Sequence, residues 1–86
     1  MRTIIMYRKD SDAIGPVRDF LGDFRRLYPD KKIEELDPDS SEGINLMRTY
    51  DLTDTPAIIS INDDGTLNGE WCGRRLPLLS EVAYYS

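Results

Sequence analysis

Four consecutive apolar residues, Ile4-Ile5-Met6-Tyr7, constrain the fold more than any other feature of this sequence. The run is rich in β-branched and aromatic side chains and lies between Arg2 and Arg8, a pattern typical of a strand. Because successive side chains of a strand point to opposite faces, an unbroken apolar run needs cover on both faces of its sheet. The sequence therefore predicts a layered α/β domain with this strand at the centre.

Three helices are expected around that strand. Apolar residues recur at spacings of three and four from Val17 to Tyr28, and Pro29 ends the pattern. A second helix should begin at a capping oxygen within residues 39–41 and end near Tyr50. Pro77 is suited to the first turn of a final helix.

Three further strands complete the predicted order β-α-β-α-β-β-α. Residues 32–37 are partly polar, which favours a short edge strand. Residues 57–61 form an apolar strand, and residues 62–65 have the composition of a hairpin turn. Residues 66–72 should return as its antiparallel partner, ended by Gly73. The first two strands should be parallel and joined by a right-handed crossover, so we expect a four-stranded mixed sheet with helices on both faces.

Composition excludes several classes of chemistry. The 86 residues suffice for one domain, 1–86, since a second core would need roughly 100 more. The chain has no histidine, which excludes Ser-His-Asp and Cys-His nucleophile pairs and nearly all zinc sites. The single cysteine, Cys72, can form neither an internal disulfide nor a dithiol redox pair by itself. We expect no metal and no cofactor, and a reducing cytoplasm as the compartment.

Charge also limits the partners. Eleven basic and 16 acidic residues give a net charge of -5, which repels nucleic acid and anionic membranes. The apolar run near the amino terminus is far too short for a signal peptide or a membrane span. We therefore expect a cytoplasmic protein that binds neither nucleic acid nor membrane.

Two segments resemble those of the thioredoxin family. Residues 13–18, Ala-Ile-Gly-Pro-Val-Arg, are similar to the family's active-site segment Trp-Cys-Gly-Pro-Cys-Lys, and Gly15 and Pro16 keep their places. Residues 50–59 are similar to the segment that contains the family's cis-proline, here Pro56. The resemblance covers the chain from about Thr3 and lacks the amino-terminal strand and helix of full-length thioredoxins. It implies a thioredoxin fold in its compact, glutaredoxin-sized form.

The residues that differ from the family remove its chemistry. Ile14 and Val17 stand where the two cysteines belong. Disulfide reduction needs an attacking thiolate and a second thiol to release the mixed disulfide, and neither side chain can supply one. Arg8 stands where thioredoxins carry a buried acid. The resemblance thus implies a site without dithiol activity.

The family's substrate surface could remain. By resemblance, Thr55 and Pro56 would pair with an extended segment of a protein or peptide partner, with Cys72 and Gly73 at the border of the same groove. Ile14 and Val17 would add apolar contacts, although Val17 also begins the helical stripe and fits a core position. Ile14 fits a cap or core position equally well.

Three alternatives stay open from the sequence. Cys72 could act as a monothiol enzyme or sensor, acidified by Arg74 and Arg75 and resolved by glutathione or a partner thiol. It could instead be a small buried apolar residue, which is where free cysteine is most often found. The chain could also be a structural subunit without a functional groove.

Overall fold

Two buried strands form the middle of a four-stranded sheet. The protein is described by a computed structural model that covers residues 1–73 and 76–85. Strands β1 (Arg2–Met6) and β3 (Ala57–Ile61) are central, and β2 (Glu34–Leu36) and β4 (Leu67–Cys72) are the edges, in the order β2-β1-β3-β4. β1 is parallel to β2 and antiparallel to β3, which is antiparallel to β4. The predicted mixed α/β sheet is confirmed.

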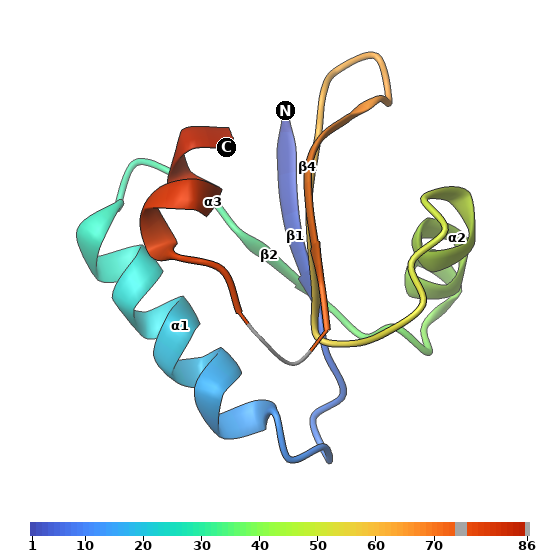
Figure 1. The fold of residues 1–86 in the computed structure, drawn as a ribbon, viewed down its shortest axis with the longest axis horizontal. Coiled ribbons are helices and arrows are strands. Elements are labelled where there is room, and N and C mark those ends of the chain that lie inside the picture. The colour runs from blue at the N-terminus through green and yellow to red at the C-terminus, as the bar shows by residue number, and fades with distance from the viewer. Residues whose placement is uncertain (74–75, 86) are drawn as a thin grey trace.

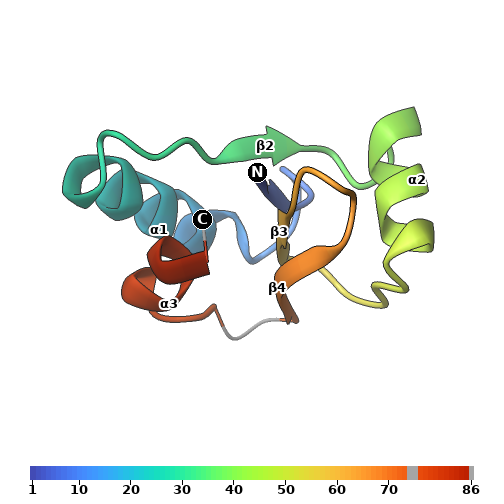
Figure 2. The same cartoon turned by 90° about the horizontal axis from the view of Figure 1, so that it is seen from above.

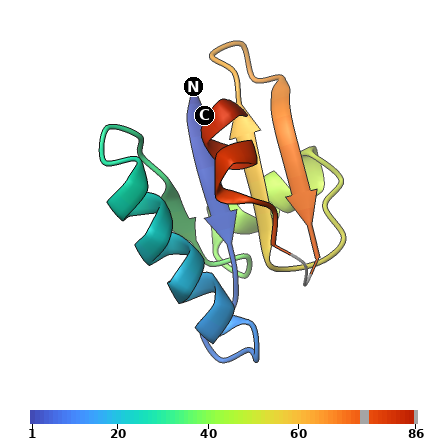
Figure 3. The same ribbon diagram turned by 60° about the vertical axis from the view of Figure 1, so that its left-hand side comes forward.

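Helices cover both faces of this sheet. Helix α1 (Ile14–Leu27) and helix α3 (Leu79–Tyr85) lie on one face, and helix α2 (Ser41–Thr49) lies on the other (Figures 1 and 2). Figure 3 shows α1 and α3 on the same side of the sheet, with α2 behind the strands. The element order β-α-β-α-β-β-α agrees with the sequence prediction.

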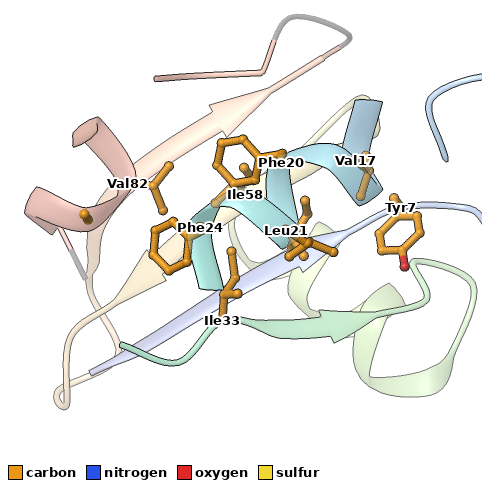
Figure 4. Packing of buried hydrophobic residues seen from close by; sticks show 10 residues of the cluster. Tyr7, Val17, Phe20, Leu21, Phe24, Ile33, Ile58 and Val82 are labelled. Carbon is orange, nitrogen blue, oxygen red and sulfur yellow. The ribbon is translucent and has the colours of Figure 1, made fainter. Parts of the chain in front are cut away.

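Successive side chains of the central strands point to opposite faces of the sheet, and this divides the core into two clusters. Ile5 and Ile58 point to the face of α1 and α3, where Val17 and Phe24 are fully buried (Figure 4). On the other face, Ile4, Met6, Leu52, Ala57, Ile59 and Ile61 pack with half-buried side chains that include Leu46 and Met47 of α2. The continuous apolar runs are therefore explained by burial on both faces.

A serine cap and a close approach of the backbone fix the start of α2. The hydroxyl of Ser40 accepts a hydrogen bond of 3.1 Å from the backbone N–H of Gly43. A Cβ at Gly43 would lie 2.1 Å from the carbonyl oxygen of Asp37, so this position has no room for a side chain. The expectation of a cap within residues 39–41 is confirmed.

Two helix boundaries differ from the sequence prediction. Helix α1 begins at Ile14, so residues 14–16 are its first turn and not a loop before it. Pro16 is tolerated there because the first N–H groups of a helix have no partner within it. Helix α3 begins at Leu79, so the expectation that Pro77 lies in its first turn is wrong. Leu78 directly precedes the helix, where its carbonyl accepts the N–H of Glu81 and its own N–H donates to the Glu81 carboxylate.

Within residues 1–73 and 76–85, no helix has the length and apolar character needed to cross a bilayer.

Candidate functional site: a groove between the start of α1 and the start of β3

A pocket of about 570 Å³ lies between the segment that leads into α1 and the segment that leads into β3. We call it the groove. Its lining residues are Asp10, Ser11, Asp12, Ala13, Pro16, Asp54, Thr55, Pro56 and Leu76. In Figure 1 these segments meet at the end of the sheet opposite the amino terminus. These two segments lie close together because β1 stops at the end of the sheet where the antiparallel strand β3 begins.

The first wall is the chain between β1 and α1. Hydrogen bonds of 3.1 Å from the Ser11 N–H to the Arg8 carbonyl and 3.3 Å from the Ala13 N–H to the Ser11 hydroxyl shape this turn. Ala13 is the N-cap of α1, and its carbonyl accepts the N–H of Val17. The wall therefore places the amino end of α1, with its partial positive charge, beside the groove.

The second wall is the segment Asp54-Thr55-Pro56. The Thr55–Pro56 peptide bond is cis. The carboxylate Oδ1 of Asp54 accepts a hydrogen bond of 2.8 Å from the N–H of Thr55. The carbonyl of Pro56 accepts one of 3.0 Å from the N–H of Gly73, which joins this wall to the end of β4.

Arg8 ties the second wall to the loop before α2. Its Nη1 lies 3.2 Å from the hydroxyl oxygen of Thr55, while Nε and Nη2 each lie 3.1 Å from a carboxylate oxygen of Asp39. This bidentate pairing keeps the pKa of Asp39 below its ordinary value. Arg8 is exposed, so it does not reproduce the buried acid that the resemblance places at this position.

The structure separates the four residues of the expected active-site loop. Gly15 and Pro16 are exposed, and Pro16 lines the groove. Val17 is fully buried among the core residues under α1, so it gives no surface to the groove. Ile14 is half-buried and packs against the same cluster. Ile14 and Val17, which stand at the family's two cysteine positions, therefore both pack against the core.

The expected groove residues fall into two groups. Thr55 and Pro56 line the groove, whereas Cys72 and Gly73 contact the Asp54–Pro56 segment without lining it. The exposed Cys72 donates its thiol proton to the carbonyl of Asp54, with a sulfur–oxygen distance of 3.0 Å. Gly73 has a φ of +109°, a conformation that favours glycine. Arg74 and Arg75, the expected neighbours of the thiol, lie outside the described residues.

Sequence reasoning missed the acidic residues of the groove. Asp10, Asp12 and Asp54 are all exposed and line it from both walls. Asp10 and Asp12 lie just before the Gly-Pro pair, and Asp54 lies two residues before Pro56, so their proximity to the resemblance motifs was the available signal. No three acidic or thiol groups among the described residues are arranged to hold one metal ion.

A smaller pocket of about 290 Å³ lies beside the groove-proximal end of β1 and is lined by Tyr7, Lys9, Glu35, Leu36 and Asp37. The Tyr7 hydroxyl donates to the Glu35 carboxylate, and Arg25 also pairs with it. The Tyr7 hydrogen bond is the main cause that holds the pKa of Glu35 below its ordinary value. Burial opposes it, and the Arg25 hydrogen bond adds a smaller lowering of this pKa. The Tyr7 hydroxyl and the Glu35 carboxylate of this pocket are therefore already paired with each other.

Comparison with known proteins supports the fold. No protein-family model matches this chain, and no curated protein matches it. Mitochondrial thioredoxin 3 from Saccharomyces cerevisiae, in its oxidised form, superimposes with a TM-score of 0.68 at 20% identity over 95% of this chain and 72% of that chain. The same values hold for a structure from a study of thiol resolution in yeast mitochondrial 1-Cys peroxiredoxin by the glutathione and thioredoxin systems. This likeness, together with the sheet order and the two-sided helix cover, shows that the chain has the thioredoxin fold.

Proposed function

We propose that this chain is a non-catalytic thioredoxin-like protein that holds an extended segment of a protein partner in the groove. One observation carries the proposal. The groove is formed by both walls, while the two positions that would carry the family's cysteines hold hydrocarbon side chains packed against the core. A groove of this kind supports binding without the thiols that dithiol reduction requires.

The size of the groove suits a few side chains of a partner. Its volume of about 570 Å³ falls within the range of pockets that bind small ligands. Pro16, Pro56 and Leu76 provide apolar surface, and Thr55 provides backbone polar groups. Because β3 begins only at Ala57, Thr55 lies outside the sheet ladder. Its backbone is therefore placed where an extended segment could pair with it.

A second candidate is a monothiol function of Cys72. Its exposure favours this reading, since a thiol must be accessible to attack a disulfide. In that reaction the Cys72 thiolate would form a mixed disulfide and expel one thiolate of the substrate, and glutathione would then release Cys72. The hydrogen bond from Cys72 to the Asp54 carbonyl opposes it, because the sulfur must lose the proton that it donates there. A disulfide-reduction assay with glutathione distinguishes the two functions, since turnover lost in Cys72→Ser would favour the monothiol.

Blocking the groove tests the binding proposal. The probes are three acetylated and amidated peptides, Ac-Val-Lys-Val-Lys-Val-NH2, Ac-Val-Thr-Val-Thr-Val-NH2 and Ac-Val-Glu-Val-Glu-Val-NH2, titrated into ¹⁵N-labelled protein. We expect saturable amide shifts at Ala13 and Thr55 with at least one peptide. Asp12→Trp places an indole in the groove and should abolish them.

The matched control is Asp30→Trp. Asp30 is an exposed residue beyond the far end of α1, so this variant makes the same change of size and charge away from the groove. It should bind as the unmodified protein does. If no peptide shifts these amides, or if Asp12→Trp binds as well as Asp30→Trp, the groove does not hold a partner segment.

A further inference from the structure

The groove carries negative charge on both walls. Three of its nine lining residues are aspartates: Asp10 and Asp12 on the α1 side and Asp54 on the β3 side. Neither lysine nor arginine is among these lining residues, all of which are described. A ligand that enters the groove therefore meets carboxylates from two directions.

Arg8, which contacts the β3 side of the groove, is already paired. Arg8 reaches the Thr55 hydroxyl, but its Nε and Nη2 are held by the Asp39 carboxylate in a bidentate pair. Arg8 is directed mainly to Asp39, and its electrostatic interaction with Asp10 is weaker. The net charge of -5 for the whole chain acts in the same direction.

The carboxylates of the groove do not form a site for a single metal ion. No three acidic groups among the described residues converge on a point where one metal ion could be held. In an extended peptide, by contrast, side chains two positions apart project on the same side, about 6.6 Å from each other. Two basic side chains of one segment can thus enter the groove together.

The carboxylate of Asp54 also affects how the Thr55 backbone can pair with a partner. Its Oδ1 accepts the N–H of Thr55 at 2.8 Å, so the amide that an extended partner would use is covered by a carboxylate of the protein itself. This bond has to break before the Thr55 N–H can donate to the partner's carbonyl, and a lysine or arginine paired with Asp54 would stabilise the displaced carboxylate. A neutral or acidic segment has to break the same bond without that ion pair.

We propose that the groove selects basic extended segments, with Asp10 and Asp12 attracting the positive side chains and Asp54 as a gate over the Thr55 amide. This inference rests on the proposed function and adds the class of partner: a protein segment with lysine or arginine at alternate positions. The ion pair between Asp54 and a basic side chain then forms together with the hydrogen bond from the Thr55 N–H to the partner's backbone.

The three peptides separate this inference from the proposed function. The lysine peptide should bind about tenfold more tightly than the glutamate peptide, since each exposed ion pair contributes a small factor. This preference should shrink when the ionic strength is raised from about 0.05 M to about 0.5 M. Equal affinities for the three peptides would overturn the charge selection and leave the groove proposal standing. Binding of none would overturn both.

Two substitutions in the groove assign the effect to its residues. Asp12→Asn should weaken the lysine peptide about threefold, while Asp30→Asn, the same change beyond the far end of α1, should leave it unchanged. If both variants lower the affinity equally, the effect is due to net charge and the assignment to the groove is wrong.

Asp54→Ala tests the gate. This variant uncovers the Thr55 N–H, so the neutral threonine peptide should bind several-fold more tightly than it does to the unmodified protein. Asp54→Asn keeps an oxygen acceptor for the N–H and removes only the charge, so it should not show that gain. If both variants bind the neutral peptide as the unmodified protein does, Asp54 is not a gate.

Discussion

Thr55 is held in place by two charged side chains. Asp54 accepts its backbone N–H, and Arg8 donates to its hydroxyl while pairing with Asp39. Three segments that are distant in the sequence thus fix one residue of the groove. The resemblance placed Thr55 at the groove, but the Arg8 pairing could not be predicted, because the position of an exposed guanidinium depends on how the loops pack.

The Arg8–Asp39 pair gives a prediction at the scale of single residues. Replacing Arg8 by Ala should raise the pKa of Asp39 towards its ordinary value, since the Arg8 hydrogen bonds are the main cause of its lowering. Titration of the side-chain carboxyl carbons by NMR measures this change. Arg26→Ala, which removes the exposed partner of Asp23, is the control and should leave Asp39 as it is. An unchanged Asp39 pKa in Arg8→Ala would show that the pair does not form in solution.

At the scale of the elements, sequence periodicity located most of the fold. Strand β3 has the expected bounds of residues 57–61, because its apolar run is buried on both faces. The stripe from Val17 located α1 but not its first turn, since Gly15 and Pro16 are exposed and leave no periodic apolar signal there. The start of α3 was placed too early, because a proline suited to a first turn also fits the approach to a helix.

Two helical glycines should respond in opposite directions to the same substitution. Gly43→Ala should lower the free energy of unfolding by more than about 2 kcal/mol, because the new methyl would meet the Asp37 carbonyl at 2.1 Å. Gly22→Ala in the exposed middle of α1 should raise it by about 0.5–1 kcal/mol, since nothing lies within 4 Å of its Cβ position. Urea denaturation measures both. Equal effects would contradict the packing of α2 against the loop that precedes it.

At the scale of the whole molecule, the two apolar clusters share the central strands. Ile4 and Ile5 are neighbours in β1 but belong to different clusters, so loss of one cluster exposes the strand that supports the other. We therefore expect residues 1–86 to unfold as one domain in a single cooperative transition. Far-UV circular dichroism and the fluorescence of Trp71 should give the same denaturation midpoint. Separate midpoints would divide the chain into independent units.

Less of the groove than of the fold could be predicted from the sequence. Thr55, Pro56 and Pro16 were found because their local motifs resemble those of thioredoxins. The acidic lining was missed because Asp12 and Asp54 are far apart in the sequence, and local spacing does not show which loop side chains meet. Cys72 was expected at the border of the groove, and its thiol donates to the backbone of Asp54, a lining residue, although the Cys72 side chain is not itself part of the lining.

The position of a bound peptide tests the central claim most directly. We would record intermolecular nuclear Overhauser effects between Ac-Val-Lys-Val-Lys-Val-NH2 and isotope-labelled protein. We expect contacts from the peptide to Ala13, Pro16, Pro56 and Leu76, which line the groove. Contacts instead to exposed apolar side chains elsewhere, such as Ile44 of α2 or Tyr84 of α3, would contradict it.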